Sequence, residues 1–436
     1  MHAPYTGVRF MMRPNGRAFK DERVTIMAFG LTKKELSWVL YDVGNSAFVM
    51  LSTALIPVYF ASIADPGSSV VVAWGYAETV ASLVLALLMP VLGSLADLAG
   101  NKKKFLVGFA GTGAVACAAL GVPEHALAFL VVYVIAAIML NGSMVFYDAF
   151  LVDATTEERY DKVSSHGYAW GYIGSCIPFI ACLAVVLGGS SFGIDAKLGM
   201  KIAFIITAAW WVVFTVPVAK NVKQLHGKKR SDHVLRTTIS GLKGTVKSIM
   251  KDKRLLFFML AFFFYIDGVH TVIKMSTSYG TDLGIDSTQL VLALLVTQFV
   301  AFPSAIAYGN LAKRFGTKRM LKVGVLAYFF IVLFAAFFLK SAVEFWILAI
   351  CVGLFQGGIQ ALSRSEYGKL IPKERANEYY GFFDIFGKYA AVMGTFLVSA
   401  FTQLTGSSSL GVLSIALLFI VGFLFLRAMP PMLGDS

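Results

Sequence analysis

The stretch GSLADLAGNKKK, residues 93–104, decides the fold, because a degenerate copy of it returns later in the chain. Residues 309–319 read GNLAKRFGTKR, so the glycines and the basic pair coincide at an offset of 216 residues. Each copy is a short polar run between two long apolar blocks. A motif that recurs at a spacing of about half the chain length indicates that the chain is built from two similar halves.

The apolar blocks are long enough to cross a membrane. The 436-residue chain is 57% hydrophobic and only 14% charged, whereas a soluble domain is nearer one-quarter charged. A soluble helical protein would also need polar faces on most of its helices. Each block can span a bilayer about 30 Å thick at about 1.5 Å per residue. There are twelve such blocks, at residues 37–63, 70–94, 104–122, 125–147, 167–189, 201–219, 255–279, 287–311, 320–339, 342–363, 378–403 and 408–428.

The basic residues predict the orientation of these helices. With twelve spans both termini lie on one side, and 33 of the 38 lysines and arginines fall on that side or in its loops. Cytoplasmic loops carry the excess of positive charge, so we expect both termini to be cytoplasmic. The net charge of +13 therefore reflects membrane topology. It does not indicate nucleic-acid binding, because the basic residues are spread between apolar blocks.

The longest polar gap, residues 220–254, divides the chain into two sets of six blocks. We expect an N-terminal bundle at 37–219, a basic cytoplasmic linker, and a C-terminal bundle at 255–428. Parallel six-helix repeats suit two halves related by an axis along the membrane normal. Residues 235–250 fit either a basic amphipathic helix on the membrane surface or a solvated linker.

The two ends of the chain are polar. Residues 1–36 have no apolar core of the kind found in a cleavable signal peptide, and we expect a disordered cytoplasmic extension there. Met27 is an alternative start, since the patterned sequence begins just after it. Residues 429–436 are predicted to be a short cytoplasmic tail.

The densest set of polar groups within an apolar block lies at residues 257–274, FFMLAFFFYIDGVHTVIK. On a helix Asp267, His270 and Lys274 fall within about 60° of one another, so they share one stripe. Charges in a bilayer are costly and usually face a bundle interior or a watery path. Asp42 in the first block matches Asp267 in the second half. We predict that at least one of these two aspartates lines a translocation path, while His270 is either a proton relay or a helix contact.

Other polar groups inside the blocks have both a functional and a structural interpretation. At the offset of 216 residues Arg364 falls opposite Asp148, and with Glu366 these groups are either functional or form structural salt bridges near the headgroups. Asp384 and Lys388 form an i,i+4 pair that either neutralises itself or has a role in function. Glu78, nearer the outer end of the second block, is functional or simply faces water. The aromatic residues near these groups are substrate contacts or packing residues: Tyr41, Tyr147, Trp170, Tyr172 and Tyr265.

Several classes of protein are excluded by absent motifs. The chain has no G-x-x-x-x-G-K-[ST] loop, so ATP is not the direct driver. It has no H-E-x-x-H and no G-x-S-x-G, and its four cysteines are scattered within apolar blocks without metal-ligand spacing. We therefore predict no catalytic residue, no metal site and no cofactor.

The G-x-x-x-D-x-x-G-x-[KR]-[KR] pattern resembles the signature of the major facilitator superfamily, and the resemblance covers residues 37–428. Four further stretches, at residues 38–48, 264–271, 356–365 and 380–388, are similar to the major facilitators related to the yeast vacuolar amino-acid effluxer of autophagy. This resemblance implies solute transport by two rocking bundles. It also implies that the first, fourth, seventh and tenth helices line a central cavity, in agreement with the observed charges.

Two sets of candidate residues follow. The substrate and proton pathway contains Asp42, Asn45, Tyr41, Asp148, Tyr265, Asp267, His270, Lys274, Gln360, Arg364, Asp384 and Lys388. The cytoplasmic gate contains Gly93, Asp97, Gly100, Lys102, Lys103, Gly309, Gly316, Lys318 and Arg319. Lys313 replaces the acidic residue in the second copy of the signature and cannot cap a helix N-terminus, so we expect only the first copy to form a strong latch.

These features predict a secondary active transporter of a small organic solute, with an amino acid as one candidate. We expect efflux coupled to protons, by a monomer in a prokaryotic plasma membrane, with the lipid bilayer as its other partner and no nucleic acid. Two alternatives stay open at this point: a membrane sensor or scaffold that moves no solute, and an integral-membrane enzyme that modifies lipid.

Overall fold

The computed structural model describes residues 28–64, 70–228 and 234–430. Within these ranges the chain is almost entirely helical and forms no β-strand, apart from one isolated bridge between Leu98 and Lys228. Residues 1–27 of the extension predicted at 1–36, and the last six residues of the tail, lie outside the described part.

Helices cover all twelve apolar blocks. The first half of the chain forms α1 (Lys33–Ala54), α2 (Ile56–Ile63), α3 (Val70–Ala96), α4 (Lys102–Ala119), α5 (Ala126–Ala149), α6 (Leu151–Ala154), α7 (Tyr160–Gly188) and α8 (Ala196–Asn221). The linker carries α9 (Val234–Lys251). The second half forms α10 (Lys253–Asp282), α11 (Ser287–Phe315), α12 (Thr317–Phe338), α13 (Ala342–Leu370), α14 (Ala376–Thr405), α15 (Ser408–Ser414) and α16 (Ala416–Ala428).

Nine helical segments of the described chain are long and apolar enough to cross a membrane, and α1 with α2 gives a tenth if the pair is one span bent by 44°. The helix α4 begins with three consecutive lysines at 102–104, which lowers its apolar character. A multi-pass helical membrane protein is thus confirmed, whereas the count of twelve crossings stays a prediction.

The first long helix of the described part begins earlier than predicted. Residues 28–36 are part of the fold: a 3-10 turn at Ala28–Gly30 precedes α1, which begins at Lys33. The Thr32 side chain accepts a hydrogen bond from the amide of Glu35, and the Glu35 carboxylate accepts one from the amide of Thr32. This capping box satisfies amides that the first turn leaves free, and it fixes the start of the helix four residues before the apolar block.

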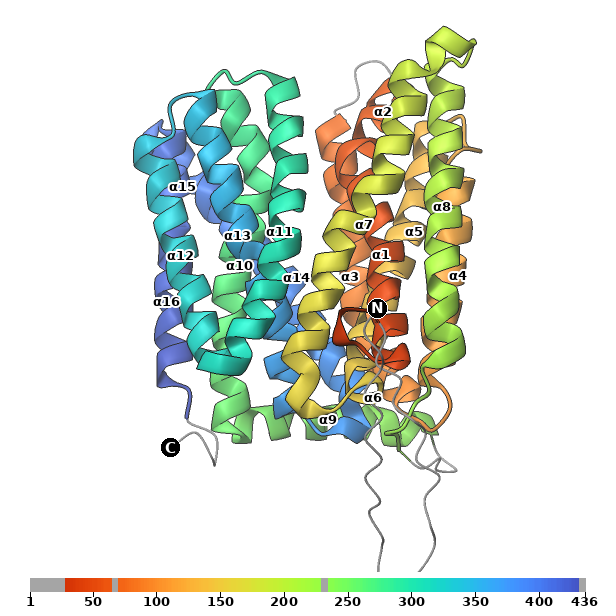
Figure 1. Ribbon diagram of the computed structural model, residues 1–436, viewed down its shortest axis with the longest axis vertical. Helices are drawn as coiled ribbons and strands as arrows, with labels where there is room; N and C mark the ends of the chain where they lie inside the picture. Colours follow the sequence, from red (N-terminus) through yellow and green to blue (C-terminus); the bar gives the residue numbers. More distant parts are fainter. Residues whose placement is uncertain (1–27, 65–69, 229–233, 431–436) are drawn as a thin grey trace, which may run out of the picture.

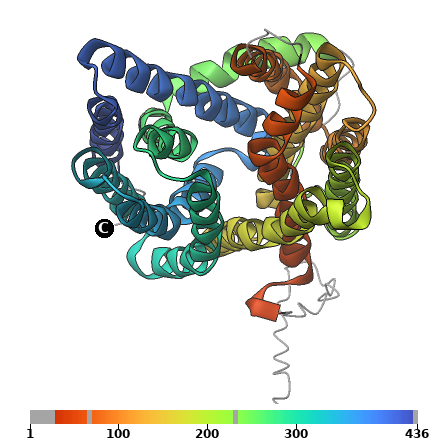
Figure 2. The ribbon, with the colours of Figure 1, turned by 90° about the horizontal axis from the view of Figure 1, so that it is seen from above.

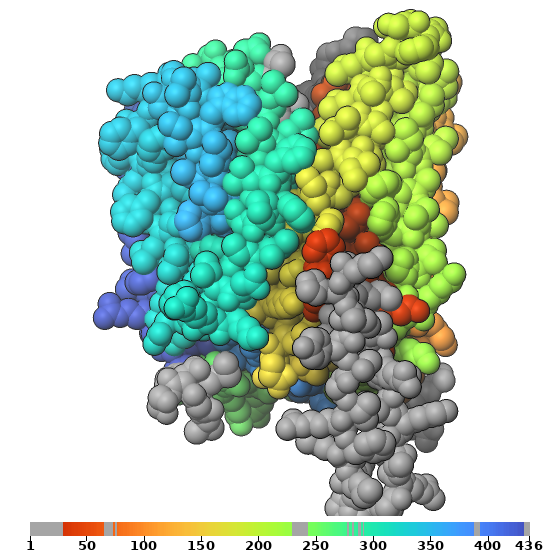
Figure 3. Space-filling view, in the orientation of Figure 1, coloured from red at the N-terminus to blue at the C-terminus, as the bar shows by residue number. Residues whose placement is uncertain are grey.

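The two halves of the chain lie side by side. In Figure 1 helices α1–α8 lie on the right and α10–α16 on the left, and Figure 2 shows the same division from above. The halves contact each other mainly through α7 with α11 and α13, and through α14 with α3 and α5. Figure 3 shows α7 against α11 on one face. We call the end of the molecule that holds residues 93–104 and 309–319 the basic end.

One glycine allows an especially close approach of two helices within the second half. A Cβ atom on Gly358 of α13 would lie 2.2 Å from Cγ of Tyr308 on α11. We expect Gly358→Ala to lower the stability by about 1–3 kcal/mol, because the ring must move to avoid this overlap. The measurement is the apparent melting temperature of the purified protein.

The matched control is Gly111→Ala in α4, where an added Cβ meets no atom within 4 Å. At that helix position alanine is favoured over glycine by up to about 1 kcal/mol. An equal melting temperature for both variants would contradict the tight α11–α13 contact.

Candidate functional site

An arginine from the second half is inserted into the first half. Arg364 lies on α13, and its side chain is only 1% exposed. Its Nη1 contacts Oδ1 of Asp148 at 2.9 Å, its Nε donates to Oγ of Ser164 at 2.9 Å, and its Nη2 donates to the Ser164 carbonyl at 2.9 Å. All three acceptors belong to α5 and α7. The buried guanidinium therefore joins the two halves of the chain.

Three aromatic rings of the first half surround the same guanidinium. The Cζ atom of Arg364 lies 4.7 Å from the ring centroid of Trp38, 5.2 Å from that of Tyr147 and 4.3 Å from that of Tyr168. Such cation–π contacts gain strength where water is excluded. Trp38 also stacks on Tyr147 and donates its indole N–H to the Tyr147 carbonyl at 2.9 Å, which fixes two of the three walls.

Asp42 on α1 completes this cluster. Its Oδ2 lies 3.7 Å from Nη1 of Arg364, and the Tyr147 hydroxyl donates to the same oxygen at 3.2 Å. Asp42 is 4% exposed, so the helix buries a carboxylate, which is tolerable because a cation and a hydroxyl face it. The structure thus brings together Asp42 and Arg364, two of the predicted pathway residues, around Tyr147. We call Asp42, Asp148, Ser164 and Arg364 with their three aromatic walls the arginine cluster.

Three further predicted residues, Tyr41, Asn45 and Tyr265, are positioning groups, each within its own half. The Tyr41 hydroxyl donates to Oγ of Ser143 at 2.6 Å, and Asn45 donates to the Tyr41 carbonyl at 2.9 Å. In the second half the hydroxyls of Tyr265 and Ser363 are likewise 2.6 Å apart. The two tyrosines occupy matching places on α1 and α10, and each ties its helix to the neighbouring α5 or α13. They support the site without contacting the guanidinium of the arginine cluster by a hydrogen bond.

Asp267 differs from its counterpart Asp42. It is fully buried, and its Oδ1 accepts hydrogen bonds from the amide of Gly394 at 2.9 Å and from the hydroxyl of Thr271 at 3.3 Å. Among the described residues its Oδ2 has no hydrogen-bond partner. The two halves therefore hold their aspartates differently, one against an arginine and one against a helix backbone.

The other polar groups of α10 lie nearer to solvent-accessible space. His270 is half-buried and hydrogen-bonds the backbone of Gly387, while Lys274 is exposed. On α13 Gln360 lies one turn before Arg364, and its amide donates to the Tyr172 hydroxyl of α7 at 3.4 Å. A second polar contact between the halves therefore lies beside the arginine cluster.

Three predicted acidic groups have separate surroundings. Asp384 is half-buried on α14, and the side chain of its predicted partner Lys388 lies outside the described part. Glu78 is exposed and accepts a hydrogen bond from the Tyr133 hydroxyl, so it does not simply face water. Glu366 is buried and lies between Arg254 at 3.5 Å and Lys369 at 3.8 Å, which fits its structural interpretation.

The first copy of the loop signature closes a latch between the halves. Asp97, directly after α3, is 1% exposed and lies at the first turn of α14. Its Oδ1 accepts hydrogen bonds from the amide of Asn377 at 2.9 Å and from the side chain of Asn377 at 2.8 Å, and its Oδ2 accepts one from the amide of Glu378 at 3.1 Å. Gly93 permits this approach, because a Cβ there would lie 2.6 Å from the Asn377 carbonyl oxygen. Negative charge suits a helix N-terminus, so Asp97 caps α14 across the interface.

Burial and the groups around Asp97 act in opposite directions on the pKa of the latch carboxylate. Burial raises the pKa of Asp97 to about 6, and Lys102, Asn377 and Lys228 oppose that rise. Lys102 is itself fully buried and contacts Asp153 at 2.6 Å. The linker completes the arrangement, because the backbones of Asp97 and Lys228 are joined by a 2.8 Å hydrogen bond.

A second latch lies between α7 and the second half. Asp161, in the first turn of α7, contacts Nζ of Lys369 at 2.8 Å and accepts hydrogen bonds from the hydroxyls of Thr317 at 2.8 Å and Ser365 at 2.5 Å. Gly309 allows the close approach, since a Cβ there would meet Oγ of Ser165 at 2.6 Å. The prediction that only the first copy forms a strong latch is therefore wrong.

The two latches differ in which element carries the acidic residue. Lys313 is exposed and does not cap α7, as expected from its sign. At the offset of 216 residues, however, Asn377 of the first latch corresponds to Asp161 of the second. In the second latch the acidic residue lies at the start of α7 instead of in the loop, and it contacts Lys369 on α13.

The remaining gate residues are turn and surface residues. Gly100 and Gly316 have φ values of +83° and +87°, a backbone conformation that glycine adopts without strain. Lys103 is half-buried and Arg319 is exposed, while Lys318 donates to the backbone carbonyl that follows α16. The gate role of these three basic residues stays a prediction.

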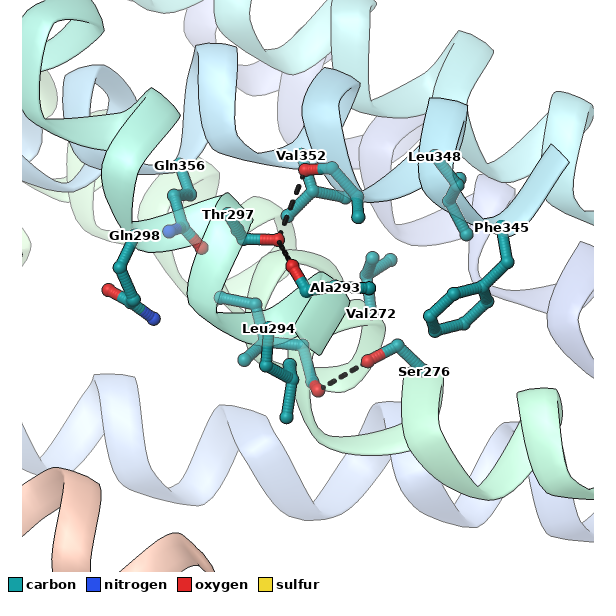
Figure 4. A pocket seen from close by; sticks show the side chains of 12 residues that line it. Val272, Ser276, Ala293, Leu294, Thr297, Gln298, Phe345, Leu348, Val352 and Gln356 are labelled. Atoms are coloured by element: carbon teal, nitrogen blue, oxygen red, sulfur yellow. Dashed lines mark hydrogen bonds between the residues drawn. The ribbon is translucent and has the colours of Figure 1, made fainter. Parts of the chain in front are cut away.

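A pocket lies among α10, α11 and α13 in the second half (Figure 4). Its walls are mostly apolar, and Phe345, Leu348 and Val352 contribute from α13. Gln298 and Gln356 form its polar end. Gln356 is 3% exposed, and its Nε2 has no hydrogen-bond partner among the described residues. The pocket therefore offers an amide donor to a guest with a hydrogen-bond acceptor and an apolar body.

Sequence reasoning missed Ser164, Tyr168, Asp153, Asp161 and Lys369. The offset of 216 residues pairs Asp153 with Lys369, and the same test found Arg364 opposite Asp148. If this offset had been applied to every charged residue at the helix ends, it would have identified both Asp153 and Lys369. Ser164 and Tyr168 carry no such signal, because serine and tyrosine are ordinary residues of a membrane helix. No group of three or more histidine, cysteine or carboxylate side chains in the described part is arranged to hold a metal.

Comparisons with known sequences identify the family of this chain. The family model described as "Vacuole effluxer Atg22 like" matches residues 67–432. The chain is 46% identical over 408 residues to the "Uncharacterized MFS-type transporter YxiO" of Bacillus subtilis (strain 168), covering 92% of this chain and 95% of that protein. It is 26% identical over 283 residues to Autophagy-related protein 22 of Cryptococcus neoformans var. neoformans serotype D, covering 60% of this chain and 48% of that protein. The chain thus spans about half the length of this fungal relative.

Solved structures show the same fold. The transporter FucP in its outward conformation superimposes with a TM-score of 0.69 at 14% identity, covering 92% of this chain and 99% of that one. The human organic anion transporter MFSD10 gives a TM-score of 0.68 at 14% identity, covering 90% and 98%. The fold and these relatives define a membrane transporter of the major facilitator superfamily, and not an enzyme. Within that superfamily, the chain belongs to the Atg22-like vacuole effluxer family.

Proposed function

We propose that this protein is a secondary active transporter that works by alternating access, with its basic end in the cytoplasm. Two six-helix bundles, residues 37–219 and 255–428, would rock about a central site, and twelve helices would cross the membrane. Both latches lie at the basic end, and they hold the halves together there. The conformation is then outward-open, which agrees with the likeness of this chain to FucP in its outward conformation.

The observation that carries this proposal is the arginine cluster. Rocking must separate α13 from α5 and α7, so the contacts of Arg364 with Asp148 and Ser164 must break in every cycle. Breaking them in a dry interior costs several kcal/mol unless another charge compensates. A proton on Asp42 or Asp148 would supply that compensation, because it removes one of the negative charges that hold the guanidinium. This gives proton coupling a defined place in the cycle.

The pocket among α10, α11 and α13 supports a small organic solute as the substrate. Its apolar wall accepts a hydrocarbon part, and Gln356 offers a donor to a carbonyl or carboxylate oxygen. An amino acid meets both requirements and agrees with the effluxer family. We also propose efflux from the cytoplasm as the direction of transport, by a monomer in a prokaryotic plasma membrane.

The experiment is a ligand screen followed by a flux measurement. Purified protein is heated with amino acids, peptides and sugars, and a specific ligand raises its apparent melting temperature by mass action. Each stabilising compound is then tested for movement across proteoliposomes with and without an imposed pH gradient. If stabilising compounds bind but none crosses the membrane, the protein is a sensor and not a transporter.

Asp267→Asn tests whether Asp267, instead of Asp42 or Asp148, carries the coupling proton. The amide oxygen of asparagine can still accept the hydrogen bond from Gly394, so we expect the variant to fold. If Asp267 carries the proton, uphill transport driven by a pH gradient should fall by at least about 10-fold, while exchange of solute at equal pH continues. Thr271→Val is the matched control, because it removes the other hydrogen bond to Oδ1 and leaves the carboxylate. Transport by Asp267→Asn at the wild-type rate and pH dependence would remove Asp267 as the carrier.

A further inference from the structure

The linker helix α9 is bound to the transport machinery by one face. It packs against α3 and α10, and Figures 1 and 2 show it crossing the basic end of the molecule near its rim. Thr245 is fully buried and Ile249, one turn later, is 7% exposed. These two residues define the inner face of the helix.

The outer face of α9 combines positive charge with exposed apolar side chains. Lys243, Lys247 and Lys251 recur every four residues, so they form one stripe, and all three are exposed. Beside this stripe lie Val246, 43% exposed, and Met250, 66% exposed. A helix in contact with water alone gains nothing from exposing a valine and a methionine one turn apart. Lysines flanking apolar residues are typical of a helix that lies in the membrane interface.

The position of α9 in the chain brings this face to the level of the lipid headgroups. The helix ends at Lys251, and α10, which is long and apolar enough to cross the membrane, begins at Lys253. Because this connection is so short, the end of α9 lies directly beside the start of a membrane-spanning helix. The lysine stripe and a layer of phosphate headgroups then carry opposite charges at the same depth.

The inner face of α9 reaches the first latch. The Thr245 hydroxyl donates to Oε1 of Glu378, and Arg375 contacts both residues. Nζ of Lys228, from the same linker, contacts Oε2 of Glu378 at 2.6 Å. The amide of Glu378 in turn donates a hydrogen bond to the carboxylate of Asp97. One hydrogen-bonded path therefore runs from the surface of α9 to the carboxylate that closes the latch.

We propose that α9 docks on the anionic headgroup surface of the surrounding membrane through Lys243, Lys247, Lys251, Val246 and Met250, and that this docking holds the Asp97–Glu378 latch closed. The consequence for turnover rests on the transport function proposed above. Anionic lipid in the leaflet at the basic end then favours the latched, outward-open state. A lysine near an anionic surface contributes about 1 kcal/mol, a factor of about 5 in the docking equilibrium, so three of them make docking strongly dependent on lipid charge.

Amide hydrogen exchange of the full chain in lipid nanodiscs tests this proposal. The protein is compared in neutral phosphatidylcholine and in phosphatidylcholine with about 30% phosphatidylglycerol, at equal ionic strength. We expect the anionic lipid to slow exchange at least about 10-fold in α9 and in the first turn of α14. In the triple variant K243Q/K247Q/K251Q this difference should disappear.

The matched control is K104Q/K313Q/R314Q, which removes the same charge from exposed positions at the basic end outside α9. This control should keep the lipid dependence of the parent. Equal exchange of α9 in both lipids, or a lipid dependence that survives in K243Q/K247Q/K251Q, would overturn the docking, and α9 would then be a solvated linker.

Thr245→Val separates docking from its effect on the latch. It should keep the lipid-dependent protection of α9 but lose that of the first turn of α14, because the hydrogen bond to Glu378 is gone. If the protection of α14 still follows lipid charge in this variant, the path through Thr245 is wrong. No step of these measurements requires transport, so failure of the docking and failure of the proposed function give distinguishable results.

Discussion

Replacing Arg364 with glutamine is expected to lower transport by at least about 100-fold, the largest effect of any single change. The variant removes a cation that contacts Asp148 and Asp42 and that fills the space between three aromatic rings. Breaking a buried ion pair by removing one partner costs about 3–5 kcal/mol, because the other charge stays buried without compensation. Such a change corresponds to a factor of about 100 or more in the balance between conformations.

The measurements are solute flux in proteoliposomes and the apparent melting temperature of the same preparation. A loss of flux could follow from misfolding alone, so the double variant R364Q/D148N is measured beside the single one. Removing both charges of this pair lowers the burial cost, but Asp42 still loses its cation. We therefore expect the double variant to recover part of the stability but not the transport. Wild-type flux in R364Q/D148N would show that the ion pair is only structural.

Arg364→Lys separates the effect of the positive charge from that of the guanidinium geometry. Lysine keeps the charge but has no planar fork, so it cannot contact Asp148 and donate twice to Ser164 while lying against the rings. We expect it to retain more stability than glutamine and to transport poorly. Full activity in this variant would mean that charge alone matters at this position.

Replacing Asp97 with asparagine has the second-largest expected effect, and it acts on the conformational equilibrium. The carboxylate accepts three hydrogen bonds from the first turn of α14, two of them from backbone amides. Asparagine has only one side-chain oxygen that can accept these hydrogen bonds. Its NH₂ group takes the place of the other oxygen and faces an N–H donor of α14, so that hydrogen bond is lost. Charge-assisted hydrogen bonds contribute about 1.5–3 kcal/mol, so the latched state should lose about 10- to 100-fold in population. Faster exchange of the amides of Asn377 and Glu378 is the direct readout.

Asp195→Asn is the matched control for Asp97→Asn. Asp195 also caps a helix, since its Oδ1 accepts a hydrogen bond from the amide of Leu198 at 2.7 Å, but α8 belongs to the same half of the chain. Its loss should weaken the start of α8 and leave the exchange of α14 unchanged. If Asp97→Asn leaves the exchange at 376–378 at the parent rate, the latch does not hold the two halves together.

Some parts of the site were available from the sequence, because they depend on local rules. Charges inside apolar blocks are rare and costly, so Asp42, Asp148 and Arg364 were recognisable as unusual. The internal repeat gives Arg364 and Asp148 equivalent positions in the two halves, and in the structure they form an ion pair at 2.9 Å, which the repeat alone did not predict. What stayed ambiguous was whether these groups belong to headgroups, to internal salt bridges or to a path.

The first copy of the loop signature shows the limit of such local rules. Its sequence predicts a cap for some neighbouring helix, but only the packing of α3 against α14 identifies the helix and its two amide donors. The second copy misled us for the same reason. A lysine at position 313 excludes a cap by that residue, whereas the acidic group Asp161 lies about 150 residues earlier and reaches the interface from α7.

The sequence by itself determined that this protein is a helical membrane transporter of two related halves, because apolar length, loop charge and the internal repeat act through short-range and topological rules. The tertiary structure alone decided which groups meet across the halves. Arg364 among Trp38, Tyr147 and Tyr168, and Asp161 beside Lys369, join residues far apart in the chain. Those contacts depend on the rotation and depth of each helix, which apolar length and charge leave undetermined and which side-chain packing fixes.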